Sequence, residues 1–225
     1  MIEINLSELL LLLDNNSIKS YQEFIKFIYD FNERQLLIEG IKIVFSDKRI
    51  DIFFDKDQKC CFLRMIKNDF YIELGDYQEN KYKTKNIPEL LNSGSKTIYF
   101  ISALAYVLKI KDLYCIDYAV VPYSDIELSI IKCILGKNTF YENFGYVPLD
   151  IIQYRDIKQM IINYSIENPT IYHESYNFLK KKKKEFIYDI DEQLNTIIKK
   201  YNKIIFIKNI NKNDLLYWQL EEKRI

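Results

Sequence analysis

The hydrophobic pattern is clearest between residues 97 and 147, where the chain alternates between helical and extended signals. Residues 98–110 are apolar on nearly every side, and a helix without a polar face is normally buried. The apolar run 113–121 is short and bounded by Asp112 and Pro122, which is typical of a central strand. We therefore predict a buried helix followed by a buried strand at the centre of the fold.

A second helix is predicted after this strand. Ser124 and Glu127 have the spacing of a capping box, in which each side chain binds the backbone amide of the other residue. The helix that they would open ends at Gly136, which suits the left-handed conformation that follows many helices. Residues 140–146, which read Phe-Tyr-Glu-Asn-Phe-Gly-Tyr, then predict an aromatic turn before a last strand.

The first 75 residues predict short helical elements followed by an antiparallel meander. Residues 1–13 hold a short strand or helix, and apolar side chains recur at helical spacing over 24–31, in a helical region that ends at Gly40. Short polar breaks separate the strand candidates, which indicates antiparallel neighbours. Three strands are predicted: 41–45 or 50–54, then 60–66, then 70–74.

The pattern becomes helical again after residue 150. Residues 153–166 and 170–201 both predict helices, and the tail around Trp218 is apolar enough to be docked. A stripe of apolar side chains repeats at alternating spacings of three and four, as in a coiled coil. Its members are Ile187, Ile190, Leu194, Ile197, Tyr201 and Ile204. We predict that this stripe is buried against the same chain or another one, so the helix 187–204 is the expected surface for a protein partner or for self-association.

Composition narrows the functional classes. Lysine plus arginine equals aspartate plus glutamate, 32 against 32, so the chain is not a globally basic nucleic-acid binder and nucleic acid is not its favoured partner, although a local basic patch stays open. No apolar run reaches the length of a membrane span. The four cysteines lack the spacing of a zinc site and His173 is the only histidine, so no metal is expected. Reduced cysteines in a soluble chain favour an intracellular, cytoplasmic protein.

The order of predicted elements resembles the GNAT acetyltransferase superfamily. The most specific match is residues 140–146, which look like the Y-E-x-x-G-F signature that closes the second core helix in that superfamily. Residues 136–141 are similar to a turn in GNAT-like proteins of large DNA viruses, which implies a viral component in the host cytoplasm or the virion. The resemblance implies an α/β (α+β mixed) fold, with a mixed central sheet flanked by helices over residues 1–150 and a helical C-terminal extension over 151–225.

The resemblance also implies a place for acetyl-CoA. In that superfamily the pyrophosphate lies on backbone amides at the start of the helix after the fourth strand, where the helix dipole favours an anion. The corresponding residues here are Ser93, Gly94, Ser95, Lys96 and Thr97. Of the two glycine positions in the family pattern R/Q-x-x-G-x-G/A, this chain keeps only the first, at Gly94. Leu91 stands in place of the arginine or glutamine, and Lys96 stands in place of the second glycine. We therefore expect acetyl-CoA binding to be weak or absent, and an ordinary serine-capped helix start is the alternative.

Three residues are candidates for catalysis. The resemblance implies that Tyr141 protonates the departing CoA thiolate, with a packed aromatic side chain as the alternative. An asparagine found earlier on the same helix in the family is replaced by Ile134. The general base would be a carboxylate on the central strands, for which Glu73 and Asp117 are the candidates, and their spacing selects neither.

Taken together, the sequence predicts a GNAT-fold protein with weak or lost acyl-CoA chemistry that acts through binding or assembly. One alternative is an active acetyl-CoA-dependent N-acetyltransferase. Another is a nucleic-acid-associated protein that uses the lysine run Lys180–Lys184. Five consecutive lysines spread around a helix, however, so a solvated turn also accounts for that run.

Overall fold

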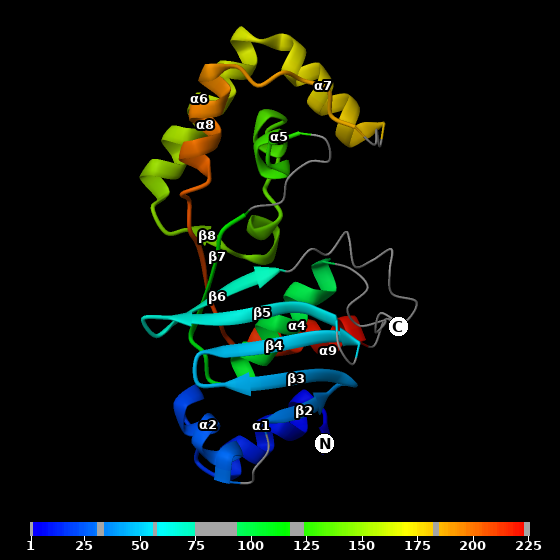
Figure 1. Ribbon diagram of the computed structural model, residues 1–225, viewed down its shortest axis with the longest axis vertical. Helices are drawn as coiled ribbons and strands as arrows, with labels where there is room; N and C mark the ends of the chain where they lie inside the picture. The colour runs from blue at the N-terminus through cyan, green and yellow to red at the C-terminus, as the bar shows by residue number, and fades with distance from the viewer. Residues whose placement is uncertain are drawn as a thin grey trace. The chain divides into compact units, whose positions relative to one another are not determined.

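The computed structural model describes residues 2–30, 34–55, 58–74, 94–117, 124–181 and 185–222. Within these ranges the chain forms eight α-helices and nine β-strands, which confirms the mixed α/β fold class (Figure 1). The chain divides into two units. The first unit combines Met1–Tyr114 with Asn209–Ile225, and the second unit is Cys115–Lys208. The domain boundary predicted at residue 150 follows the family resemblance instead, and it stays a prediction.

Strands β1 to β7 of the first unit lie side by side in chain order. β1 runs parallel to β2, and the strands from β2 to β6 form the predicted antiparallel meander. The strands are β1 (Ile2–Ile4), β2 (Gln35–Ile38), β3 (Ile41–Ser46), β4 (Arg49–Asp55), β5 (Gln58–Ile66), β6 (Asp69–Leu74) and β7 (Asp112–Cys115). The two ranges that the sequence offered as alternatives, 41–45 and 50–54, are therefore both strands.

Two hairpins of this meander close through pairs of residues with positive φ. Glu39 and Gly40 (φ 51° and 72°) join β2 to β3, and Lys67 and Asn68 (φ 51° and 76°) join β5 to β6. Two consecutive positive φ angles form the type I′ turn, whose twist matches that of an antiparallel pair. The prediction that a helical region runs to Gly40 is wrong, because helix α2 ends at Asp30 and β2 precedes the glycine.

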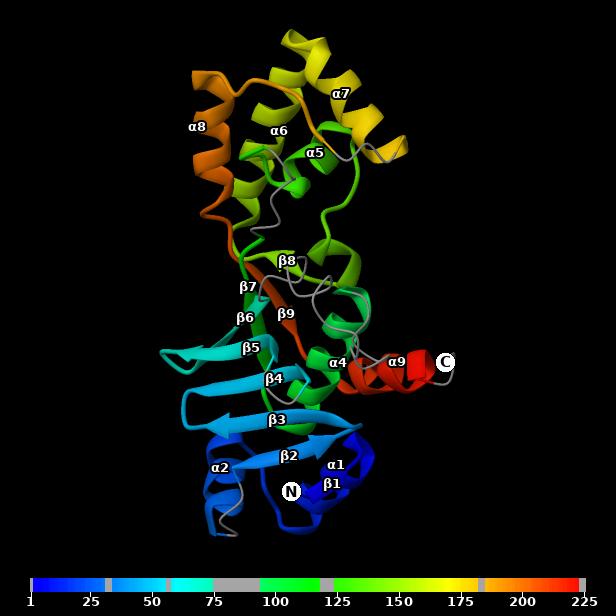
Figure 2. The ribbon, with the colours of Figure 1, turned by 45° about the vertical axis from the view of Figure 1, so that its right-hand side comes forward.

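The helices of the first unit gather on the apolar face of its sheet. The ring centres of Phe24 of α2 and Phe45 are 5.0 Å apart, and those of Tyr21 and Phe70 are also 5.0 Å apart. Both pairs pack edge to face. Figure 1 shows α1, α4 and α9 behind the strands, and Figure 2 shows the same helices turned to the right of them. The helices are α1 (Leu6–Asn15), α2 (Tyr21–Asp30), α4 (Gly94–Val107) and α9 (Lys212–Glu222).

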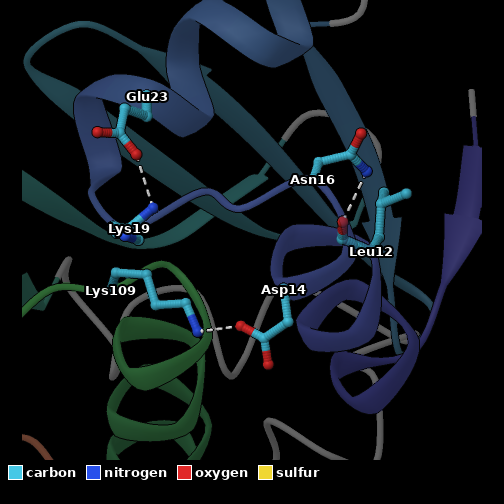
Figure 3. Close-up of polar contacts among 6 residues, drawn as sticks. All are labelled: Leu12, Asp14, Asn16, Lys19, Glu23 and Lys109. Carbon is cyan, nitrogen blue, oxygen red and sulfur yellow. Dashed lines mark hydrogen bonds and ion pairs between the residues drawn. The ribbon is translucent and has the colours of Figure 1, made fainter.

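Helix α4 is the predicted buried helix at the centre of the first unit. Its side chains are buried on nearly every side. The Phe100 ring lies 5.2 Å from Trp218 of α9, which confirms that the apolar tail is docked. Just beyond the helix, Lys109 adopts a φ of 60° and places its ammonium 2.7 Å from Asp14 Oδ1 at the end of α1 (Figure 3).

Helix α4 connects two strands that are neighbours in the sheet, β6 and β7. The rings of Tyr71 and Tyr114 from these strands stack at 5.2 Å with an interplanar angle of 27°. The predicted juxtaposition of the two strands is confirmed, and their relative direction stays a prediction. The chain returns to the first unit at Ile210, whose backbone N–H donates to the carbonyl of Lys111 at 2.7 Å.

The second unit is mainly helical. Helix α8 packs against α6, and the short strands β8 and β9 pair antiparallel with Val147 opposite Ile207. The elements are α5 (Leu128–Ile134), the 3₁₀ turn η2 (Tyr141–Phe144), β8 (Val147–Pro148), α6 (Ile151–Glu167), α7 (Pro169–Lys180), α8 (Glu192–Tyr201) and β9 (Phe206–Asn209). Strand β9 was not predicted inside the helical extension.

The helix predicted before Gly136 is present as α5, but its predicted start is wrong, and so is the predicted extent of the helix over 170–201. Helix α5 begins at Leu128, and Ser124 accepts a hydrogen bond from the Ile126 amide at 3.0 Å instead of forming a capping box with Glu127. The helix predicted over 170–201 is interrupted, since α7 ends at Lys180 and residues 185–191 are not helical.

The predicted apolar stripe is buried along its C-terminal part only. Leu194, Ile197, Tyr201 and Ile204 are at most 2% exposed, whereas Ile187 is 72% exposed. Because α8 packs against α6, the buried part of the stripe is covered by a helix of the same chain. The helix predicted at 187–204 spans Glu192–Tyr201, and a partner for it stays a prediction.

Candidate functional site

The residues that the resemblance assigns to acetyl-CoA lie at the start of α4, in the first unit. Gly94, Ser95, Lys96 and Thr97 form its first turn, and Ser93 lies outside the described residues. Thr97 is completely buried, Lys96 is half-buried and Ser95 is exposed. A helix start has backbone amides that favour an anion. The turn therefore has the right polarity for a phosphate, but a lysine side chain stands where the family has a glycine.

The candidate catalytic residues are divided between the two units. Glu73 lies in β6 of the first unit, opposite Phe62 of β5. Asp117 follows β7 and Tyr141 opens η2, and both belong to the second unit. Asp117 is 3% exposed and Tyr141 is 5% exposed. Asp117 and Tyr141 therefore share a unit, and Glu73 does not.

Tyr141 is surrounded by aromatic side chains. Its ring lies 5.4 Å from Phe140 and 5.4 Å from Tyr146, edge to face in both cases. The turn that holds it ends at Gly145, whose φ of 81° is in the left-handed region that glycine adopts most readily. These are the surroundings of a packed core tyrosine.

Glu142, the next residue, organises this turn. Its Oε2 accepts a hydrogen bond from the Thr139 amide at 2.7 Å, and Thr139 Oγ1 accepts from the Glu142 amide at 3.4 Å, which is a capping box. Its Oε1 lies 3.0 Å from Nζ of Lys158 on α6. Burial alone would raise the pKa of Glu142, but the Thr139 amide and the Lys158 ammonium outweigh burial and hold that pKa below its usual value. Glu142 is thus ionised at neutral pH and ties η2 to α6.

Tyr154 and Cys133 border this ion pair. The Lys158 ammonium lies 4.6 Å from the centre of the Tyr154 ring. Tyr154 Oη faces Glu142 and Cys133 without a hydrogen bond of normal geometry to any described residue. Burial raises the pKa of the Cys133 thiol to about 11, and Lys158 offsets this only in part. Because the thiolate is the reactive form, Cys133 is a poor nucleophile at neutral pH.

A second group of buried polar side chains lies where α5 begins and α8 ends. Glu127, Ser129 and Tyr201 are at most 3% exposed, and each has a polar atom that makes no hydrogen bond of normal geometry to a described residue, although Tyr201 faces Ser129. Burial raises the pKa of Glu127, the Asn202 side chain opposes this, and the nearby Asp117 adds to it. A buried polar atom without a well-formed hydrogen bond lowers the free energy of unfolding, so this group destabilises the second unit locally.

Other chemistries find little support in the described ranges. His173 is exposed on α7, and Cys61, Cys115 and Cys133 are buried free thiols. No group of three or more potential metal ligands occurs among the described side chains. Lys180 ends α7 and is exposed, whereas residues 182–184 of the lysine run lie outside the described residues.

Sequence reasoning selected Tyr141 and overlooked Glu142 and Lys158. One signal was available, because Thr139 precedes Glu142 at the spacing of a capping box. The pairing with Lys158 had no sequence signal, since it depends on how α6 packs against the turn. The polar group around Glu127 and Tyr201 was equally hidden, because it joins residues more than 70 positions apart.

Comparisons with protein-family models, with curated proteins and with solved structures find no match for this chain. Of the helices that the structure describes, none is long and apolar enough to cross a membrane.

Proposed function

We propose that this chain is a GNAT-fold protein whose acyl-CoA chemistry is weak or lost and which acts through binding or assembly. The observation that carries the proposal is the path from β6 through α4 to β7. It joins two neighbouring strands through a buried helix that begins at Gly94. In the superfamily that the sequence resembles, such a helix start holds the pyrophosphate of acetyl-CoA.

Two features support weak rather than efficient chemistry. A glycine at the position of Lys96 would let the backbone approach a phosphate, and the lysine side chain hinders that approach. Tyr141, which would protonate the departing thiolate, has only 5% of its surface exposed and packs between two rings. A proton donor must reach the leaving group to within hydrogen-bond distance, so this placement disfavours the role.

A role in binding or assembly is supported by apolar side chains around the start of α6. Val147, Leu149, Ile151 and Ile152 are between 50% and 71% exposed. Four large apolar residues within six positions are typical of an interaction surface. The similarity of residues 136–141 to GNAT-like proteins of large DNA viruses extends the proposal to a viral component.

Calorimetric titration with acetyl-CoA tests the proposal. For the wild-type protein we expect a dissociation constant no tighter than about 1 mM, which corresponds to roughly −4 kcal/mol. Lys96→Gly restores the second glycine of the family pattern and should tighten binding about tenfold, whereas Lys137→Gly in an exposed loop should leave it unchanged. Circular dichroism would check that both variants fold.

Two results would contradict the proposal. Micromolar or tighter binding by the wild-type protein would favour the alternative of an active N-acetyltransferase, for which loss of turnover in Tyr141→Phe would be the next test. If Lys96→Gly gains no affinity, the start of α4 is not a phosphate site and the GNAT interpretation loses its main support.

A further inference from the structure

Two acidic side chains are buried close to each other in the second unit, near the start of α5. Glu127 and Asp117 are each 3% exposed. Asp117 lies just after β7 and Glu127 lies just before α5, yet the charge of Asp117 acts on the carboxyl group of Glu127. Acidic side chains are almost never fully buried unless a partner or a proton removes their charge. The charge state of this pair therefore matters for the stability of the second unit.

Glu127 is the N-cap residue of α5, but its side chain does not cap the helix. A carboxylate at this position usually accepts a hydrogen bond from a backbone amide of the first turn, and Glu127 makes no such bond. Its Oε2 is buried and makes no hydrogen bond of normal geometry to a described residue, although the Asn202 side chain at the end of α8 faces the carboxyl group. The carboxyl group is thus withdrawn from water without the amide donors that usually stabilise its ionised form.

The groups around the two acids come from β7, from the turn before α5, from α5 itself and from the end of α8. Those that act on Glu127 or Asp117, or on which Asp117 acts, are Cys115, Asp125, Lys132, Cys133, Tyr201 and Asn202. Lys132 supplies the positive charge of this set, and Asp117 attracts it. The two charged side chains that act on Glu127, by contrast, are both carboxylates, those of Asp117 and Asp125.

Ionisation of Glu127 is unfavourable in these surroundings. Burial raises its pKa most, the Asn202 side chain and the residue's own backbone amide lower it, and Asp117 and Asp125 raise it further. The net result is a pKa above the usual 4.5. Two carboxyl groups that are buried close together cannot both ionise without a cost, because little water is present to screen their repulsion. A proton on Glu127 removes this repulsion.

We propose that a proton on Glu127 keeps the start of α5 docked in the second unit, and that loss of this proton at rising pH opens the first turn of the helix. Helix α5 packs against α6 and α7, so the ionised carboxylate reaches water when that turn moves away from them. Ile126 and Ile130, which are completely buried in the closed form, become accessible at the same time. The device is a pH-sensitive switch. It uses none of the residues assigned to acetyl-CoA and does not depend on the proposed function.

Amide hydrogen exchange of α5, followed by mass spectrometry on the full chain, tests this proposal. Glu127→Gln keeps the shape of the side chain but cannot ionise, and comparing it with the wild type at each pH cancels the pH dependence of the chemical exchange step. A group with a raised pKa stabilises the closed form fully below its unfolded pKa of 4.5, and this contribution is lost as the pH rises through the folded pKa. The opening constant of the wild type, relative to Glu127→Gln, should therefore rise about tenfold per pH unit above 4.5 and then level off. Asp125→Asn, at an exposed acid of the same turn, is the matched control and should keep the wild-type profile within about threefold.

Three outcomes would overturn the proposal. One is a relative opening constant that stays flat between pH 4.5 and pH 8. Another is a profile that Asp125→Asn flattens as well, which would place the titrating group at Asp125. The third is closure of wild-type α5 at pH 8 by about 1 mM Ca²⁺ or Mg²⁺ with no such effect in Glu127→Gln, which would show that a cation and not a proton neutralises the pair. Should Glu127→Gln fail to fold, a carbon-13 NMR titration of the Glu127 carboxyl group in the folded wild type decides: a pKa above 4.5 supports the proposal, and one at or below 4.5 overturns it.

Discussion

Lys158 of α6 lies 3.0 Å from Glu142 of the aromatic turn, and the two side chains are only 29% and 17% exposed. The pair joins a 3₁₀ turn to the longest helix of the second unit that the structure describes. Because the same carboxylate also accepts the Thr139 amide, one side chain fixes both the shape of the turn and its attachment. The Tyr-Glu pair that resembles a catalytic signature thus has a structural role through its glutamate.

Removing the cation should destabilise the second unit in a pH-dependent way. Lys158→Met should lower the free energy of unfolding by about 1–2 kcal/mol at pH 7, because it leaves a largely buried carboxylate without its counter-ion. The pKa of Glu142 is lower in the folded protein than its usual 4.5. The ion pair therefore adds to the free energy of unfolding above pH 4.5, and this contribution is lost as the pH falls through the lower pKa that Glu142 has in the folded protein. Urea titrations at pH 7 and pH 3 would measure this.

The exposed Lys203→Met provides the control for that experiment, since it removes the same charge from a turn. It should change the free energy of unfolding by less than about 0.5 kcal/mol at either pH. A Lys158→Met variant that remains equally destabilised at pH 3 would show that lost packing, not the ion pair, is responsible.

The packing of α8 on α6 can be tested at two positions of the same stripe. Leu194→Ala should lower the free energy of unfolding by about 2–5 kcal/mol, because Leu194 is completely buried. Ile187→Ala, at a residue 72% exposed, should cost less than about 0.5 kcal/mol. Light scattering should give an unchanged mass for both variants. A drop in mass with Leu194→Ala would instead show that the stripe is an assembly surface.

Two tyrosines of the second unit should respond in opposite directions to loss of their hydroxyl group. Tyr201 Oη is buried and faces Ser129, but it makes no hydrogen bond of normal geometry to any described residue, so Tyr201→Phe should be neutral or stabilising by up to about 1 kcal/mol. Tyr164 Oη donates to Asp191 at 2.7 Å, so Tyr164→Phe should cost about 1 kcal/mol. Thermal melts of both variants would decide. If Tyr201→Phe is the more destabilised, the polar group around it is satisfied in solution.

The buried cysteines should be chemically silent in the folded protein. In a Cys60→Ser background the remaining thiols are Cys61, Cys115 and Cys133, all buried. With the pKa of Cys133 raised to about 11, roughly one molecule in a thousand carries the thiolate at pH 8. A colorimetric disulfide reagent should therefore react with all three only after denaturation. A fast phase in the native protein would mean that one of them is accessible and activated.

Predictions held where the signal lies in consecutive residues. The apolar residues around Phe100 leave no polar face, so burial of that helix follows directly. Gly136 adopts a φ of 64°, as expected of a glycine just past a helix end. The short polar breaks of the meander likewise specify antiparallel neighbours before any tertiary contact is known.

Predictions failed where tertiary packing overrides a local pattern. Ser124 and Glu127 have capping-box spacing, but Glu127 is itself the N-cap residue, directly before α5 begins at Leu128. Its side chain is buried, so it does not reach back to Ser124. The coiled-coil spacing extends back to Ile187, but α8 begins only at Glu192. Asp191, the residue before it, caps the helix by accepting a hydrogen bond from the Leu194 amide. At the site, the Glu142–Lys158 pair joins separate elements and has no local signature.

The return of the C-terminal segment to α4 has a consequence for how the protein is made. Strands β1 to β7 and α4 leave the ribosome first, but Trp218, which covers Phe100, follows only after the whole second unit. At synthesis rates of about 5–20 residues per second, that interval lasts roughly 5–20 s. The apolar surface of α4 is uncovered during this time, while the second unit is continuous in sequence and free to fold. We therefore expect the chain to need a chaperone during synthesis, in the interval before Trp218 is available to cover α4.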